Sequence, residues 1–323
     1  MDRRIKFRHL DAFSAISRAG SLKTAAEQLH LTQPAISRTL KELEEIVGVT
    51  LMVRSRSGVK LTGEGEVFLQ FAEQSTAALR SGLMSVRGVS GGGGHLRIGA
   101  LPSVASGLLP PAVLEFADRN PGTQIEVHEG PHYDLTSRLR WGELDLVIGR
   151  LGRPQTMQGL SFRQLYTEDV VVVTAAGGEA AAIRTFSGLE DFRILYPPQD
   201  SAIRPLVARL LISRGVPLFR NRIESASAAF GRATVLADPR TVWFISRGVV
   251  EADIAAGRMV QLDVDTGATV GAVGIMSRAD EVPSAAIRAF TRVLSRASAT
   301  PDDLGHRGQG QPDDPRNGRA GDA

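Results

Sequence analysis

The chain has 323 residues, of which 42% are apolar and 23% are charged, and it contains no cysteine. This length and apolar content suit two or three globular domains, and the ordinary charge content excludes a chain that is disordered throughout. The lack of cysteine excludes disulfides, thiolate nucleophiles and cysteine-ligated zinc or iron–sulfur sites. No apolar run has the roughly 18 residues that a membrane span needs, and no signal peptide is expected at the N-terminus, so the sequence predicts a cytoplasmic protein.

The net charge of +3 is unevenly distributed along the chain. Residues 1–60 hold 11 Lys and Arg against 6 Asp and Glu, whereas residues 298–323 hold 3 Arg against 5 Asp. A basic N-terminal segment, called the head below, on an otherwise neutral chain predicts that the head binds a polyanion and that the rest of the chain has a different function.

The first sixty residues predict three short helices followed by a hairpin. Gly20 ends the first apolar-periodic run, and Ser21 is a candidate N-cap for a second helix. Thr32 would cap a third helix, which has Pro34 in its first turn, where a missing N–H is tolerated. Two short apolar runs then flank a basic tip, which predicts a β-hairpin.

The spacing of the second and third helices is typical of a helix-turn-helix, since only His30-Leu31 separates them. Polar side chains near the start of the third helix can reach bases and phosphates, and that end of a recognition helix enters the major groove. The basic hairpin would form a wing beside it. The residues predicted to contact DNA are Ser21, Thr24, Thr32, Gln33, Pro34, Ala35, Ser37, Arg38, Lys41, Arg54 and Arg56. The alternative interpretation is a solvated helix face and an ordinary hairpin.

A longer helix is predicted from about Gly63 to Arg87, followed by the glycines at 91–94, which predict a flexible hinge. Its apolar stripe consists of Phe68, Phe71, Ala72, Ser75, Leu79, Leu83 and Val86. A single helix cannot bury such a stripe on itself, so the stripe predicts packing against a second copy of the chain.

Beyond residue 94 the pattern changes to alternating strands and helices. Strands are predicted near residues 96–100, 124–128, 144–148, 170–174, 193–196, 243–245 and 273–276, and helices near 108–118, 134–140, 203–214 and 283–295. This alternation predicts parallel sheets with right-handed crossovers. From residue 298 onward the chain has almost no apolar residue, which predicts a disordered tail.

Several segments of the head match the signature of one family. They are residues 13–18, 20–22, 25–26, 29, 32–37 and 43–44, with Val53-Arg54 and Leu61-Thr62 at the wing and its exit. Together they resemble the N-terminus of LysR-type transcriptional regulators. Pro121-Gly122 and Gly142-Glu143-Leu144-Asp145 are similar to that family's first effector lobe. The segment from Glu129 to Ile148 most resembles the subgroup that regulates protocatechuate catabolism (PcaQ-type) and galactose-binding-protein genes.

The resemblance spans about residues 5–295 and implies an all-α winged helix-turn-helix head and an α/β effector domain. The implied parts are the head at 1–62, a linker helix at 63–90, a glycine hinge at 91–94, and a two-lobed effector domain at 95–297 that is similar to a periplasmic binding protein. Lobe I would hold about 95–165 and 269–297, and lobe II about 166–268. The family further implies a homodimer or homotetramer on a pseudo-palindromic operator, with no catalysis, cofactor or metal.

The strand-to-helix turns of the effector domain are where α/β sheets bind their ligands. Helix-start N–H groups at such turns favour a carboxylate or another anion. The residues predicted to hold an inducer are Ser103, His132, Tyr133, Ser201 and Arg204. In the resembled family the inducer lies between the lobes, against the counterpart of Ser103 and the opposing turn. Each of these residues could instead be a helix cap or turn residue, and Arg204 a surface residue of its helix.

Two enzyme sequence motifs also occur, but the context of each one indicates a chance match. Residues 128–132 satisfy the H-E-x-x-H pattern of zinc proteases, but Gly130 and Pro131 exclude the helix on which that chemistry depends. Residues 88–92 satisfy G-x-S-x-G, but they follow a helix and enter a glycine run. A solute-binding protein with the same two-lobed fold is the remaining alternative, and the basic head argues against it.

Overall fold

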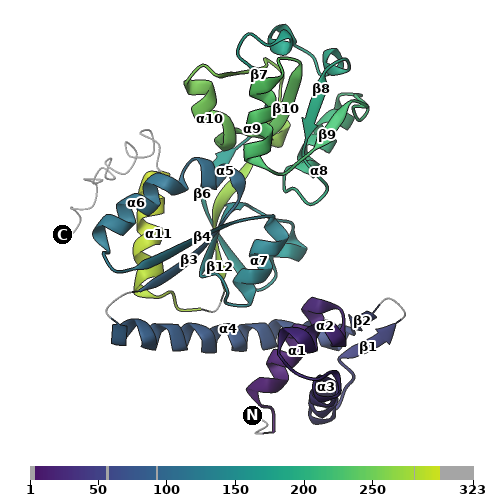
Figure 1. The fold of residues 1–323 in the computed structure, drawn as a ribbon, viewed down its shortest axis with the longest axis vertical. Coiled ribbons are helices and arrows are strands. Elements are labelled where there is room, and N and C mark those ends of the chain that lie inside the picture. The colour runs from purple at the N-terminus through teal and green to yellow at the C-terminus, as the bar shows by residue number, and fades with distance from the viewer. Residues whose placement is uncertain (1–3, 56–57, 92–93, 280, 299–323) are drawn as a thin grey trace, which may run out of the picture.

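The computed structural model describes residues 4–55, 58–91, 94–279 and 281–298. A small head, a long helix and a two-lobed domain follow one another along this part of the chain (Figure 1). The wing-tip residue Arg56, two of the hinge glycines and the predicted tail from residue 299 lie outside the described residues.

The head consists of three helices and an antiparallel hairpin, as the sequence predicts. Its elements are α1 (Phe7–Ala19), α2 (Leu22–Gln28), α3 (Gln33–Val47), β1 (Met52–Ser55) and β2 (Gly58–Leu61). The Oγ of Ser21 accepts from the N–H of Thr24, and the Oγ1 of Thr32 accepts from the N–H of Ala35, both at 3.4 Å. Gly20 ends α1 at a φ of 60°, a conformation that favours glycine. Both predicted N-caps are therefore confirmed.

The core of the head extends onto α4 (Gly63–Gly91), the long helix that follows. Phe13, Ile36 and Leu43 are fully buried, and burial of a side chain of this size contributes about 1.5–3 kcal/mol. Phe68 of α4 meets Phe13 edge-on, with 5.3 Å between the ring centroids. The start of α4 thus belongs to the packed head.

The predicted apolar stripe of α4 divides between two faces. Phe68 and Ala72 pack into the head core. Phe71, Leu79 and Leu83 instead remain 61%, 46% and 55% exposed. The face with these three exposed side chains is available to pack against another copy of the chain.

The two-lobed domain contains two five-stranded sheets. The first has the order β4-β3-β5-β12-β6, with β3 (His95–Ala100), β4 (Gln124–Glu129), β5 (Leu146–Arg150), β6 (Leu160–Glu168) and β12 (Gly271–Arg278). The second has the order β11-β7-β10-β8-β9, with β7 (Val170–Ala175), β8 (Arg193–Tyr196), β9 (Arg222–Glu224), β10 (Thr241–Ser246) and β11 (Met259–Gln261). The chain passes to the second sheet after Glu168 and returns at Gly271.

Both sheets are mixed, so the prediction of parallel sheets was wrong for several strands. The strand β3 runs parallel to β4 and β5, and β8 runs parallel to β9 and β10. In contrast, β12 is antiparallel to β5 and β6, and β7 is antiparallel to β10 and β11. The antiparallel strands lie where the chain crosses between lobes without a helical crossover, and only such a crossover imposes parallel pairing.

Helices cover both sheets. They are α5 (Pro102–Ser106), α6 (Leu109–Arg119), α7 (His132–Arg140) and α11 (Ala285–Ala297) around the first sheet, and α8 (Arg204–Ser213), α9 (Ala228–Ala237) and α10 (Arg247–Ala255) around the second. Short 3-10 turns occur at Pro154–Met157, Glu179–Ala182, Ser187–Leu189 and Gly267–Thr269. None of the described helices is long and apolar enough to cross a membrane.

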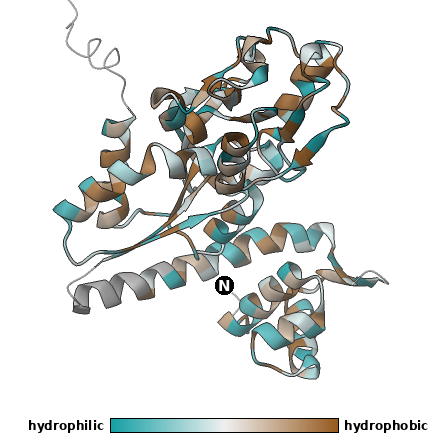
Figure 2. Ribbon diagram, turned by 45° about the horizontal axis from the view of Figure 1, so that its top comes forward, coloured by the Kyte–Doolittle hydropathy of each residue, from teal (hydrophilic) through white to brown (hydrophobic). Residues whose placement is uncertain are grey.

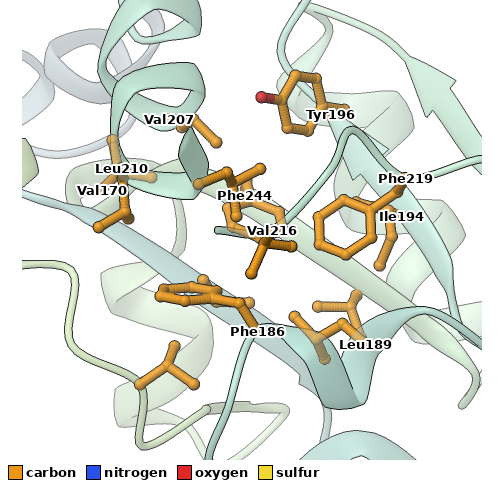
Figure 3. Packing of buried hydrophobic residues seen from close by; sticks show 14 of the residues in the cluster. Val170, Phe186, Leu189, Ile194, Tyr196, Val207, Leu210, Val216, Phe219 and Phe244 are labelled. Carbon is orange, nitrogen blue, oxygen red and sulfur yellow. The ribbon is translucent and has the colours of Figure 1, made fainter. Parts of the chain in front are cut away.

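Each lobe has its own aromatic core, and hydrophobic residues concentrate on the central strands (Figure 2). In the first lobe Phe116 and Phe290 meet edge-on, with centroids 5.4 Å apart. In the second lobe Phe244 lies about 6 Å from the rings of Phe186, Tyr196 and Phe219 (Figure 3). Two separate cores leave the surface between the lobes available for a ligand.

Candidate DNA interface and effector cleft

The start of α3 presents an exposed polar surface of the head. The helix buries Ile36, Leu40 and Leu43 in the head core, so its opposite face is directed to solvent. The predicted contact residues on this surface that are exposed are Thr24, Thr32, Gln33, Pro34, Ala35, Arg38 and Lys41, whereas Ser21 and Ser37 are half-buried. The side chains that sequence reasoning selected therefore lie together around one helix end.

The wing is attached directly to this helix. Arg54 of β1 donates from Nη2 to the Oγ of Ser37, over 2.8 Å. The N–H of Val59 donates to the carbonyl of Gly20 over 2.8 Å, which fixes the hairpin to the turn between α1 and α2. Wing and recognition helix thus form one continuous surface with a guanidinium beside the helix start.

The acidic side chains farther along α3 are held by contacts within the head. Glu44 accepts from the N–H groups of Leu51 and Met52, at 2.8 and 3.1 Å. Glu42 pairs with Arg8 at 3.1 Å. These contacts limit the negative charge that α3 presents beside its basic start.

A cavity of about 180 Å³ lies between the two lobes. Ser103 at the start of α5 and Ser201 before α8 both line it, from opposite lobes. Its other polar lining residues are Glu129, Arg150, Asp200, Ser225 and Ser246, and its apolar walls include Leu101, Pro131, Ile203, Phe244 and Val249. Two of the five predicted ligand residues are thus brought together.

The other three predicted ligand residues lie outside the cavity lining. Tyr133 projects into solvent and is 71% exposed. His132 is buried beneath Gly152, and burial, aided by the charge of Arg140, lowers the pKa of the imidazole. Both residues belong to the first turn of α7, whose N-cap residue, Pro131, reaches the cavity in their place.

Arg204 is directed away from the cavity because other groups already bind its guanidinium. Its Nη1 donates to the carbonyl of Pro197 over 2.7 Å and pairs with Glu224 at 3.1 Å. The guanidinium also stacks on the ring of Tyr196, 4.6 Å from the centroid. Arg204, which the sequence predicts to face an inducer, therefore lies outside the cavity lining and instead holds the loop that precedes α8.

The guanidinium that lines the cavity is that of Arg150, which sequence reasoning missed. Arg150 is the last residue of β5 and is buried. Its Nη1 donates to the carbonyl of Thr269 at 3.1 Å, and its Nη2 to the carbonyl of Glu168 at 3.0 Å. Its Nε has no hydrogen-bond partner among the described residues. A basic residue at the carboxyl end of a buried strand was the signal that could have identified it.

Glu168 places a buried carboxylate beside Arg150, at the point where the chain first crosses between lobes. Its Oε2 lies 3.6 Å from Nη2 of Arg150, and its Oε1 accepts from the N–H of Gly248 at 3.0 Å. Burial raises the pKa of Glu168, while the Gly248 N–H and the charge of Arg150 act in the opposite direction. A Cβ on Gly248 would lie 2.8 Å from the carbonyl of Ser103, so α5 and α10 are in close contact across the cleft.

Comparison with known proteins identifies the family. Residues 7–66 match the family described as bacterial regulatory helix-turn-helix protein, lysR family, and residues 90–299 match the LysR substrate binding domain. The chain belongs to the LysR family of transcriptional regulators. The regulator PcaQ of Agrobacterium fabrum is 40% identical over 301 residues, which cover 92% of this chain and 96% of that protein. The uncharacterized regulator YdcI of Escherichia coli is 32% identical, covering 91% and 96%.

Solved full-length LysR structures share the fold. LysG of Corynebacterium glutamicum, with bound effector arginine, has a TM-score of 0.59 at 19% identity and covers 91% of this chain and 98% of its own. CbnR has a TM-score of 0.56 at 18% identity, covering 92% and 100%. The predicted head and two-lobed α/β domain are thus confirmed, and the chain is a DNA-binding LysR regulator with an effector domain.

The two enzyme motifs have other roles in this LysR regulator. His128 lies on β4, where its Nε2 is 3.3 Å from Glu126, whereas His132 begins α7. Among the described residues no group of three or more His, Asp or Glu side chains is arranged to hold a metal ion. The described part of the G-x-S-x-G segment is the helical end of α4.

Replacing Gln33 by alanine should reduce sequence discrimination more than affinity for DNA in general. Gln33 stands exposed at the first position of α3, where a bidentate contact to adenine discriminates by about 1–3 kcal/mol. Arg54→Ala should instead weaken binding to all sequences and reduce the salt dependence, because a phosphate contact carries no sequence information. Fluorescence anisotropy on selected and scrambled DNA at several salt concentrations separates the two effects. Unchanged discrimination in Gln33→Ala would mean that α3 is not the reading helix.

Proposed function

We propose that this LysR regulator binds operator DNA through α3 and the wing, under the control of a small carboxylate held between the lobes. The observation that carries the proposal is Arg150, a buried guanidinium that lines the cavity opposite Ser201. A guanidinium suits an anion, and Ser103 supplies a hydroxyl on the same side of the cleft. We propose the same division into head, linker helix, hinge and effector domain as the sequence suggests.

The remaining lining favours a carboxylate that carries hydroxyl groups on an unsaturated or aromatic frame. Phe244, Ile203 and Val249 offer apolar walls, while the carboxylates of Glu129 and Asp200 can accept hydrogen bonds from ligand hydroxyls. This chemistry agrees with the resemblance to regulators of protocatechuate catabolism. Protocatechuate and its acidic breakdown products are therefore our first candidates, and a catalytic role is not part of the proposal.

The exposed apolar face of α4 supports an oligomer in which two heads meet two half-sites. LysR regulators form oligomers, and a two-fold protein axis requires a pseudo-palindromic operator. Such a protein would act in the cytoplasm, where it has access to chromosomal DNA.

Selection of binding sites from random DNA, followed by footprinting of the chain's own promoter region, tests the proposal. We expect a pseudo-palindromic site whose footprint changes when protocatechuate or a related carboxylate is added. Galactose and other sugars belong in the same panel, because the second resembled subgroup controls sugar-binding-protein genes. A protein that binds one of these small molecules but selects no DNA would be the alternative, a solute-binding protein.

A further inference from the structure

The loop that follows α7 contacts both the head and the long helix. The indole Nε1 of Trp141 donates to Oε1 of Glu73 on α4. Arg18 at the end of α1 lies over the Trp141 ring, 4.5 Å from its centroid, and donates to Oε1 of Glu143 at 3.2 Å. Figure 1 shows α7 next to the half of α4 that begins at the head. Loop residues 141–143 thus join elements of the DNA-binding head to lobe I.

This contact is packed closely and includes a buried charge. Gly142 has a φ of +70°, and a Cβ on it would lie 2.9 Å from Cα of Ala77 on α4. Arg80 donates to the carbonyl of Trp141 at 3.2 Å. Glu73 is only 7% exposed, so its carboxylate depends on the Trp141 N–H and on the guanidinium groups around it. Because the Trp141 N–H is a directional donor to this buried carboxylate, the contact fixes one arrangement of α4 relative to lobe I.

Helix α7 connects this loop to the effector cleft. Gly130 and Pro131, which immediately precede α7, line the cavity, and Trp141 follows directly after its last residue. Nine helical residues span about 14 Å as one rigid element. A displacement at the cleft end of α7 is therefore transmitted to the head contact.

We propose that loop residues 141–143 are a head-positioning site, which fixes the winged head against lobe I and thereby determines the half-site spacing that the oligomer accepts. The inference rests on the proposed function, because spacing has meaning only if the heads bind DNA. When one head has bound, the effective concentration of the second depends on how closely its orientation is fixed. A docked head favours one spacing, whereas a head released from lobe I accepts several.

The geometric part is tested without DNA or effector. Because the chain has no cysteine, spin labels can be placed at Lys23→Cys on α2 and Arg292→Cys on α11, both exposed positions. Labelled chains diluted into unlabelled protein report the distance within one chain. We expect a narrow distance distribution in the parent protein and a broad one in Glu73→Ala. Trp141→Phe, which keeps the ring for Arg18 but removes the N–H donor, should also broaden it.

Glu64→Ala serves as the matched control, since it makes the same substitution as Glu73→Ala at an exposed position in the first turn of α4. It should leave the distribution narrow. A distribution that stays narrow in both Glu73→Ala and Trp141→Phe, with circular dichroism showing folded protein, would overturn the proposal.

The proposed effect on half-site spacing is tested by measuring binding to three kinds of DNA. They are the site that the parent protein selects from a random pool, derivatives with the half-sites moved by one or more base pairs, and a single half-site. Glu73→Ala should bind the single half-site like the parent protein, while its preference for the selected spacing falls by about tenfold or more. An unchanged spacing preference would overturn the proposal even if the distances broaden. Failure of the parent protein to select any DNA would instead contradict the proposed function, and the spin-label distances would still show whether the head is docked.

Discussion

Replacing Leu79 and Leu83 of α4 by glutamate should convert the oligomer into monomers and lower affinity for the two-half-site operator by about 100-fold or more. Both side chains lie on a face of α4 that the described residues of the head and lobe I leave uncovered, and each is about half exposed. In an oligomer formed through this face, the variant would bury two unpaired carboxylates, which is strongly unfavourable. Light scattering measures the mass, and anisotropy on operator DNA measures the affinity.

Ile212→Glu combined with Val282→Glu is the matched control, because it changes two exposed apolar residues outside α4 to the same charged side chain. This variant should keep the mass and operator affinity of the parent protein. If the Leu79 and Leu83 variant also kept its mass, the exposed face of α4 would not be the interface, and the effector domains would have to supply it.

Local signals were sufficient to predict the head. Ser21 and Thr32 cap α2 and α3 as predicted, because an N-cap depends on only three or four consecutive residues. The division of the α4 stripe could not be predicted in the same way. Phe68 and Phe71 are both apolar and three residues apart, and only the position of α1 decides that the first is covered and the second exposed.

The sequence identified residues that line the cleft where the backbone dictates their position, but not where side-chain direction decides. Ser103 and Ser201 lie at strand-to-helix turns, and both line the cavity. Arg204 satisfies the same positional rule, but the Pro197 carbonyl and Glu224 hold its guanidinium outside the cavity. These contacts join residues 7 and 20 positions apart, and no local pattern reports them.

Arg150 was missed because the strand was predicted to end before it. The expected strand covered residues 144–148, whereas β5 covers Leu146–Arg150. The two-residue shift moves the carboxyl end of the strand onto the arginine. The strand β6 was not predicted at all, because its pairing with β12 joins segments more than 100 residues apart along the chain.

Neutralising the buried pair of Arg150 and Glu168 should remove most of the affinity for a carboxylate effector. Arg150→Gln alone would leave Glu168 as an unpaired buried carboxylate, so it would combine a ligand effect with a folding effect. Arg150→Gln together with Glu168→Gln leaves neither charge; the substitution at Glu168 keeps the shape of the side chain, whereas the one at Arg150 shortens it. Loss of a desolvated, charge-assisted contact to the ligand should then cost about 2–5 kcal/mol of binding free energy.

Calorimetry with the carboxylate that alters the footprint measures this loss. Arg163→Gln is the control, since Arg163 lies exposed on β6 of the same lobe and donates to Ser295 of α11 rather than to the cavity. It should bind the carboxylate like the parent protein. Equal affinity in the double variant and the parent would place the anion away from Arg150. A selective loss would show that the ligand carboxylate lies at the end of β5, next to the crossing that joins the lobes. Arg150 donates to the carbonyls of Thr269 and Glu168, which lie on the two segments that connect the lobes. A ligand bound to this guanidinium would therefore be linked through Arg150 to both connections.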